Sequence, residues 1–168
     1  MLDHVFPDQA QDAKLTAIGL FAEAYTGLTS RFAAQIAEHG LAAVEFEVLL
    51  RLSRSPGEQL RMTDLSSQTS LTTSGVTRVV DRLERDGLVG RRACQGDRRI
   101  SYAVITEQGK ARLAAVLPGH LEMIERWFTG QLSPERLAAF TEALRTIRDA
   151  VRPGATAGAD AEPVPHTH

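Results

Sequence analysis

The sequence predicts a mainly α-helical fold with one small β-hairpin. Apolar residues recur at three- and four-residue steps over most of the chain, and capping residues precede several of these stretches. A single pair of short strand-like runs lies near the middle. The 168 residues, 43% of them hydrophobic, suit one domain with a core, and the single cysteine excludes an internal disulfide.

The amino-terminal part predicts two helices. The first spans about residues 12–38 and ends at Gly40. Its apolar seam consists of Leu15, Ile18, Ala22, Tyr25, Phe32 and Ile36, widened by Phe21 and Leu28. The second spans 44–52 and begins less sharply, because Ala42 has no side-chain oxygen for a helix cap.

Two helices separated by a tight turn follow. Thr63 is expected to cap the first of them, over 64–69, and Thr72 to cap the second, over 73–86. Gly87 ends the second helix at its C′ position. This arrangement is that of a helix-turn-helix, in which the second helix reads nucleic acid.

The second helix of this pair has two contrasting faces. Its apolar stripe, which should face the core, consists of Val76, Val79, Val80 and Leu83. The opposite face carries hydroxyl and guanidinium groups, which can meet phosphate oxygens and read base edges. The predicted DNA contacts on this helix are Thr72, Thr73, Ser74, Thr77, Arg78 and Arg82. A solvated charged face would have the same pattern, so the helix alone is weak evidence. Gly75 inside it suggests a close approach of the backbone to another helix or to DNA.

The strand-like runs at 88–94 and 100–105 enclose a loop with arginine at its tip. A hairpin beside a helix-turn-helix is a wing, and an arginine at its tip can enter the minor groove, where the potential is most negative. We predict that Arg99 inserts there, and that Asp97 holds Arg98 or Arg99 extended through a bidentate pair.

Charge is segregated along the chain. Residues 72–101 hold seven arginines and four acids, a net charge of +3, whereas the whole chain carries −2 and the remainder therefore −5. A basic element on an acidic body indicates a polyanionic partner. We find no Ser/His/Asp order, no clustered metal ligands and no phosphate-cradling glycine loop, and expect no enzyme activity, cofactor or metal site.

Membrane and redox roles have weaker signals. No stretch is apolar enough for a membrane span and the N-terminus lacks a signal-peptide pattern, so we expect a cytoplasmic protein without a membrane partner. Cys94 lies between arginine pairs whose positive field would favour a reactive thiolate. Such a cysteine is more often a small packing residue, and both interpretations stay open.

The carboxy-terminal part predicts two helices and a tail. Thr106 opens the first helix, which Pro118 should bend. Its apolar positions are Leu113, Val116, Leu117, Leu121, Ile124 and Phe128. Ser133 caps the second helix. Its apolar positions are Leu137, Phe140, Leu144, Ile147 and Val151. Residues 152–168 have no apolar period, and we expect them to be disordered.

These motifs resemble the MarR (multiple antibiotic resistance regulator) family. The resemblance covers roughly residues 12–150 and depends on the spacing from the second helix through the wing to the start of the next helix. The matching segments are Leu71–Val89, Arg91-Arg92, Asp97-Arg98-Arg99 and Ile105–Gly109.

The resemblance implies a homodimer whose terminal helices interlock and whose two recognition helices meet successive major grooves of a pseudo-palindromic operator. Apolar seams at both ends of the chain also favour a dimer over a monomer with two exposed stripes. The divisions implied are an N-terminal arm at 1–11, dimerisation helices at 12–40 and 106–151, a DNA-binding lobe at 41–105 and the tail at 152–168.

We therefore expect a sequence-specific regulator of transcription, acting as a repressor, that a small aromatic or phenolic effector releases from double-stranded DNA by changing the distance between the recognition helices. The resemblance implies an effector pocket between the dimerisation helices and the DNA-binding lobe. Its expected residues are Tyr25, Phe32, His39, Phe46 and Trp127, with Arg31 as a carboxylate partner. The alternative is a winged-helix protein-interaction module without DNA binding, whose wing should lack cations.

Overall fold

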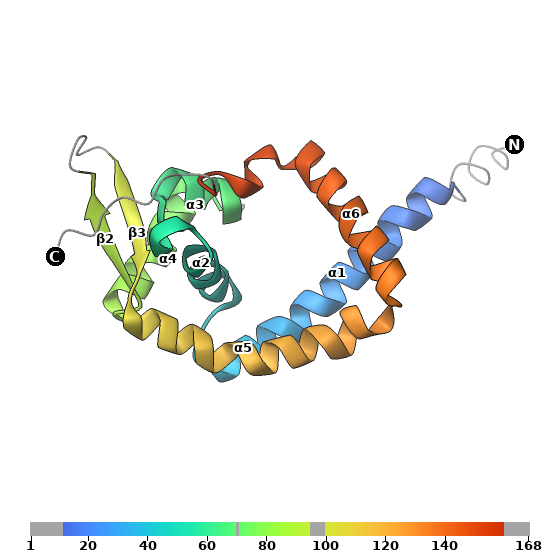
Figure 1. Cartoon of the computed structure of the whole chain (residues 1–168), viewed down its shortest axis with the longest axis horizontal. Helices are drawn as coiled ribbons and strands as arrows, with labels where there is room; N and C mark the ends of the chain where they lie inside the picture. Colours follow the sequence, from blue (N-terminus) through green and yellow to red (C-terminus); the bar gives the residue numbers. More distant parts are fainter. Residues whose placement is uncertain (1–11, 70, 95–99, 160–168) are drawn as a thin grey trace, which may run out of the picture.

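A small sheet and three short helices form one end of the molecule, and three longer helices extend from it (Figure 1). This computed structural model describes residues 12–69, 71–94 and 100–159. The helices are α1 Ala13–Glu38, α2 Ala43–Ser53, α3 Met62–Thr69, α4 Thr73–Arg85, α5 Glu107–Trp127 and α6 Pro134–Val151. The strands are β1 Gln59–Arg61, β2 Val89–Ala93 and β3 Ser101–Ile105, and the described 3₁₀ turns are η2 Pro56–Glu58, η3 Thr129–Gln131 and η4 Pro153–Thr156.

The two amino-terminal helices match their predicted bounds to within one residue. The Asp12 carboxylate accepts the Lys14 N–H at 2.8 Å and so caps α1. The start of α2, predicted to be poorly defined, is stabilised by a hydrogen bond that was not predicted from the sequence. The Glu45 carboxylate accepts the Ala42 N–H at 2.9 Å, so the half of a capping box that does not need a side-chain oxygen on Ala42 is present.

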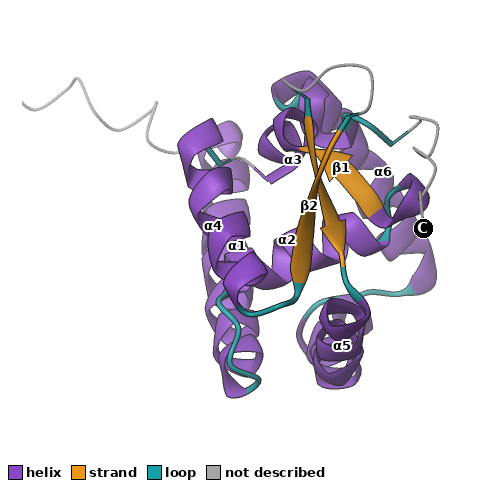
Figure 2. Cartoon of the chain, turned by 90° about the vertical axis from the view of Figure 1, so that its left-hand side faces the viewer, coloured by secondary structure: helices purple, strands orange, loops and turns teal. Residues whose placement is uncertain are grey.

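The sheet has three strands in the order β1-β3-β2, all antiparallel, where the sequence predicted a two-stranded hairpin. The extra strand, β1, follows the predicted turn at Pro56 and Gly57 and pairs Arg61 with Tyr102. Three residues are too few to show a period of two, so the sequence pattern could not reveal this strand. Figure 2 shows the strands crossing in front of α2, with α4 beside them.

The core lies among α2, α3, α4 and the sheet. We call these four elements together the lobe. The predicted stripe of α4 is confirmed, because Val76, Val80 and Leu83 are 0% exposed and Val79 5%. Of the long helices α1, α5 and α6, only the lobe-proximal ends of α1 and α5 join this core. Large apolar side chains that remain exposed are Leu15, Ile18, Leu20, Phe21, Tyr25, Leu121, Phe140, Ile147 and Val151. None of the described helices has the length and apolarity that a membrane span requires.

The two helices of the helix-turn-helix differ in how well the sequence located them. The prediction that Thr63 caps α3 is wrong, because α3 begins at Met62 and Thr63 lies inside it. The predicted caps of α4 are confirmed: Thr72 Oγ1 accepts the Gly75 N–H at 3.1 Å, and Gly87 adopts a φ of +73° at the other end. A Cβ on Gly75 would lie 3.1 Å from that same Thr72 oxygen, so its close neighbour is its own capping turn and not a second helix.

Hydrogen bonds join the start of α5 to the turn that follows α4. Thr106 Oγ1 donates to the Gly87 carbonyl at 2.7 Å and accepts the Gly109 N–H at 3.0 Å. A Cβ on Gly109 would lie 2.1 Å from the Leu88 carbonyl oxygen, so only glycine allows this approach. Farther along, Pro118 does not end the helix, since α5 continues through it to Trp127.

The prediction of a disordered tail is wrong for residues 152–159. After α6 the chain forms η4 and packs against α3, where Ala155 is 5% exposed. Arg152, Arg51 and Gln68 form hydrogen bonds that hold this segment. Composition misled the prediction because small residues bury little apolar area but let two backbones approach closely. Residues 160–168 and the predicted N-terminal arm at 1–11 lie outside the described residues.

Replacing Gly109 by alanine tests the joint at the start of α5. We expect Gly109→Ala to lower the free energy of unfolding by about 1–3 kcal/mol, because the new methyl group overlaps a backbone carbonyl that cannot move alone. Urea denaturation followed by circular dichroism measures this change. The control is Gly90→Ala in β2, where a Cβ would meet no atom within 4 Å. This substitution should raise the free energy of unfolding by about 0.5–1 kcal/mol. Equal effects of the two substitutions would contradict the account of the joint.

Candidate nucleic-acid interface

The exposed face of α4 presents the side chains predicted to contact DNA. Thr73, Ser74, Thr77 and Arg78 are all exposed. Ser74 and Arg78 lie on the side opposite the buried valines, Thr77 lies at its edge, and Thr73 lies in the exposed first turn. Within the described part of the chain, Arg78 makes no ion pair and no side-chain hydrogen bond. Its five guanidinium donors therefore remain available to a ligand outside the chain.

The hydroxyl groups gather at the N-terminal end of α4, where helix N–H groups also lack intrahelical acceptors. Thr72 Oγ1 caps the helix and lies 3.2 Å from Ser74 Oγ. Thr77 Oγ1 donates to the Thr73 carbonyl at 3.0 Å. These local bonds fix the hydroxyl positions. The positive end of the helix dipole and the hydroxyl hydrogens that these bonds do not use suit an anionic ligand.

Arg82 has a partner inside the chain. Its Nε donates to Glu45 Oε1 at 2.9 Å, so the arginine links α4 to the first turn of α2. The same glutamate accepts the Ala42 N–H. The structure therefore gives Arg82 a positioning contact within the lobe, and its predicted contact with DNA remains a prediction.

An arginine that the sequence analysis did not select holds the wing against α4. Arg91 of β2 lies 2.6 Å from Asp81 and 2.8 Å from Glu84, both carboxylates of α4. Acids three residues apart on a helix face one side, and that spacing is the signal that could have identified the pair. Because the side chains are 30–48% exposed, these ion pairs add little stability but restrain the orientation of the hairpin.

Two arginines also lie on the face of the sheet that points away from the core. The strand register places Arg61 and Arg92 on either side of Tyr102. Arg61 Nε donates to the Tyr102 hydroxyl at 3.1 Å, and this hydrogen bond raises the pKa of Arg61 above its ordinary value. Arg92 donates to Gln59 Oε1. This pair could not be predicted from the sequence pattern, because β1, which supplies Arg61, is too short to show a strand period.

The predicted tip of the wing, with Asp97, Arg98 and Arg99, lies outside the described residues. The strands leading to it are confirmed, and the Cys94 N–H donates to the Ile100 carbonyl at 2.9 Å just before the tip. Cys94 itself is half-buried and forms no disulfide.

Comparison with known proteins identifies the family. The MarR family profile matches residues 39–100. The HTH-type transcriptional regulator MhqR of Bacillus subtilis is 31% identical over 128 residues, which is 76% of this chain and 86% of the relative. The chain belongs to the MarR family. The predicted resemblance is therefore confirmed, and this MarR chain is a DNA-binding transcriptional regulator.

Solved structures of the family confirm the predicted fold class. AbsC, a MarR family regulator from Streptomyces coelicolor, is 32% identical with a TM-score of 0.79, covering 85% of this chain and 97% of its own. Sco3205 from the same organism, solved in complex with DNA, is 29% identical with a TM-score of 0.79, covering 84% and 94%. The mainly helical winged helix-turn-helix is thus the architecture of this chain.

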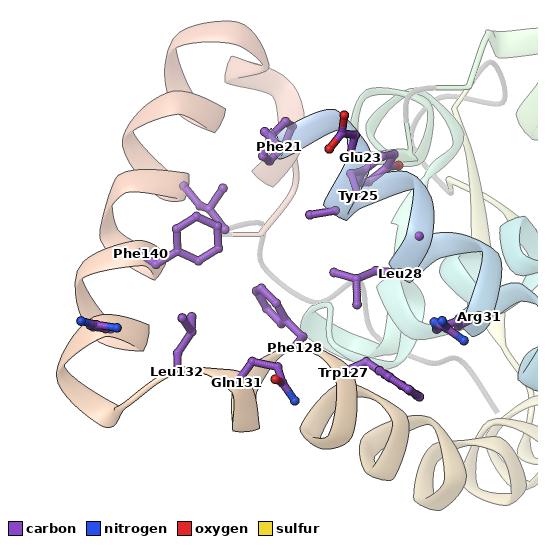
Figure 3. A pocket seen from close by; sticks show the side chains of 14 residues that line it. Phe21, Glu23, Tyr25, Leu28, Arg31, Trp127, Phe128, Gln131, Leu132 and Phe140 are labelled. Atoms are coloured by element: carbon purple, nitrogen blue, oxygen red, sulfur yellow. The ribbon is translucent and has the colours of Figure 1, made fainter. Parts of the chain in front are cut away.

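An apolar groove of about 790 Å³ lies between α1, the end of α5 and α6 of this MarR chain (Figure 3). Three of the predicted effector residues line it, namely Tyr25, Arg31 and Trp127. The Arg31 guanidinium lies 4.3 Å from the centre of the Trp127 ring. Across the groove, the rings of Phe128 and Phe140 meet edge to face at 6.0 Å. The sequence pattern places these two rings in apolar seams and does not predict that they line a groove.

The structure does not bring the other predicted effector residues to this groove. The rings of Phe32 and Phe46 contact His120 edge-on at 5.1 and 4.7 Å, and His39 ends α1. Tyr25 and His39 are about 20 Å apart along one helix at 1.5 Å per residue, so a single small pocket cannot hold both. His120 was not selected from the sequence, and burial lowers the pKa of its imidazole.

Neutralising Asp81 tests whether the ion pairs with Arg91 orient the wing. We expect Asp81→Asn to weaken binding of an operator duplex by up to about fivefold, although it removes a negative charge near DNA, because a loosened hairpin must be ordered on binding. Fluorescence anisotropy with a labelled duplex measures the dissociation constant. The control is Asp86→Asn, which removes the same charge from an exposed residue at the end of α4. If Asp81→Asn tightens binding as much as the control does, Asp81 only repels DNA.

Proposed function

We propose that this MarR-family regulator binds a pseudo-palindromic operator as a homodimer, acts as a repressor, and is released by a small aromatic effector. The observation that carries the proposal is the exposed face of α4, on which Arg78 makes no ion pair or side-chain hydrogen bond with any described residue. That face is presented by a packed lobe beside a wing held to the same helix by Arg91.

Each part of this surface has a separate task in the proposal. α4 enters the major groove, where Arg78 can pair with the two acceptors of a guanine edge. The hydroxyls of Thr72, Thr73 and Ser74 and the helix N-terminus bind phosphate, which sets the register of the protein on the duplex. Thr77, whose hydroxyl donates to the Thr73 carbonyl, contacts the duplex through its methyl group or as an acceptor. Arg99, outside the described residues, is assigned to the minor groove, with Asp97 and Arg98 beside it.

The exposed seams on the long helices support the homodimer. Ile18 on α1, Leu121 on α5 and Ile147 on α6 are each between 57% and 60% exposed. Monomeric proteins rarely leave apolar surface of this extent in water. A second copy that packs the same seams against these would bury them and fix the separation of the two recognition helices.

The Arg31 and Trp127 end of the groove is our proposed effector site. A planar aromatic acid can lie against the apolar wall of the groove and place its carboxylate against the Arg31 guanidinium, which stacks on the Trp127 ring. Because the long helices that line the groove also set the spacing of the recognition helices, an effector that prefers the mis-spaced dimer shifts the population away from DNA. Phe32, His39 and Phe46 are not part of this site.

The alternative, a protein-interaction module without DNA binding, has less support. Its wing should lack cations, yet β2 carries Arg91 and Arg92 and α4 presents Arg78. A relative of similar length, Sco3205, was solved bound to DNA.

Truncating Arg78 tests the proposed reading of bases. Selection from a random duplex pool with purified protein gives the operator, and anisotropy then gives affinities for the operator and for single-base variants. We expect Arg78→Ala to weaken operator binding by about 1–3 kcal/mol and to lose discrimination at one base pair in each half-site. The control, Arg145→Ala on α6, should change neither. If Arg78→Ala keeps full discrimination at every position, this residue does not read bases.

A charge placed in the α1 seam tests the dimer. Burying an isoleucine contributes about 1.5–3 kcal/mol, so Ile18→Lys should raise the dissociation constant of the dimer by at least about tenfold. Sedimentation velocity over a concentration series measures it. Ala34→Lys adds the same charge to an exposed position on the opposite side of α1 and should leave the dimer intact. A wild-type chain that sediments as a monomer would refute the dimer outright.

A further inference from the structure

The segment Arg152–Ala159 connects the end of α6 to the lobe. Figure 1 shows the chain leaving the lobe along α5 and returning along α6, with η4 reaching α3. We call this segment the strap. It creates a third connection between the long helices and the lobe, in addition to the start of α5 and the end of α1.

Arg152 binds the C-terminal end of α3. Its Nη2 donates to the carbonyls of Ser67 and Gln68 at 3.0 and 3.1 Å. Carbonyls in the last turn of a helix have no intrahelical donor and carry the negative end of the dipole. The guanidinium of Arg152, which lies 84 residues after Gln68 and directly follows α6, satisfies them here.

Side chains of the lobe bind the strap backbone in return. Gln68, which is 5% exposed, donates from Nε2 to the Ala157 carbonyl. Arg51 Nη1 lies 3.5 Å from the Ala155 carbonyl oxygen. Donors from two different helices, α2 and α3, therefore meet carbonyls two residues apart.

The strap also fits the lobe sterically. A Cβ on Gly154 would lie 3.1 Å from Ser67 Cβ. Gly158 has a φ of +79°, and a Cβ there would lie 2.9 Å from the Asp64 carboxylate. Together with the burial of Ala155, these contacts favour small residues at positions 154, 155 and 158.

We propose that the strap fixes the angle between the long helices and the lobe, and thereby sets the half-site spacing that the dimer accepts. Arg152 is a positioning residue in this proposal and need not touch DNA. The inference rests on the proposed function, because half-site spacing has meaning only for a DNA-binding dimer.

The physical reason is the number of attachments. Among the described residues, a lobe without the strap stays attached to the long helices at the start of α5 and at the adjoining end of α1, where Arg112 Nη1 donates to the His39 carbonyl at 3.2 Å. Because these two attachments lie together, the lobe can still rotate about them, and the dimer samples many separations of its two α4 helices. A further attachment at α3, which directly precedes α4, removes this freedom. Strap loss spreads the population over more separations, so binding to the correct spacing weakens and discrimination against wrong spacings falls.

Truncation and point variants test the proposal on DNA. The operator is compared with duplexes whose half-sites are one base pair closer or farther apart. A chain ending at Val151 and the variant Arg152→Ala should lose at least about fivefold of the preference for the correct spacing. A chain ending at Ala159, which keeps the strap, and Arg148→Ala, which removes a neighbouring arginine of α6, should keep the full preference. Unchanged preference in both strap variants would overturn the proposal.

A second measurement does not depend on DNA. Spin labels at Arg85→Cys on α4 and Arg145→Cys on α6, in a Cys94→Ser background diluted with unlabelled chain, report the distance from the recognition helix to α6 within one chain. Arg152→Ala should broaden this distance distribution, and Arg148→Ala should not. Equal widths would refute the strap even if the protein binds DNA, whereas broadening in a chain that ignores every duplex would refute the proposed function alone.

Discussion

Burial of the apolar stripe of α4 is the constraint on which the rest of the structure depends. With Val76, Val80 and Leu83 fully buried, α4 has one rotation about its axis. That rotation turns Arg78 outward and directs Asp81 and Glu84 toward β2, where they meet Arg91. The recognition surface is thus a consequence of packing, since no other orientation of α4 buries the same side chains.

The lobe transmits this orientation to the long helices through contacts that admit only small residues or specific donors. Gly109 allows α5 to start against the Leu88 carbonyl, and Arg152 fastens the end of α6 to α3. Between these two points the long helices leave most of their apolar side chains exposed. The chain therefore combines a well-packed lobe, which holds the recognition helix, with exposed apolar seams on the long helices. A dimeric regulator needs both a rigid DNA-binding part and an apolar surface for its partner.

The elements that the sequence located well are those with strong local signals. Periodicity defined the α4 stripe, and Thr72 and Gly87 marked its ends, because capping chemistry acts within one turn. β1 and the strap escaped prediction because their partners, β3 and α3, are distant in sequence and their own patterns are short or apolar-poor. The sequence predicted one pocket for six effector residues, of which only Tyr25, Arg31 and Trp127 line the same groove. Four of the six lie on α1 or at its end, and this helix of 26 residues is too long for all of them to reach one pocket. Arg91 was missed because its importance comes from two acids on another element.

The affinity of the purified protein for its selected duplex across a range of salt concentrations tests the central claim most directly. A basic surface that neutralises phosphates releases counterions, so the logarithm of the association constant should fall linearly as the logarithm of the salt concentration rises. Binding that is independent of salt, or absent in dilute buffer, would contradict the account.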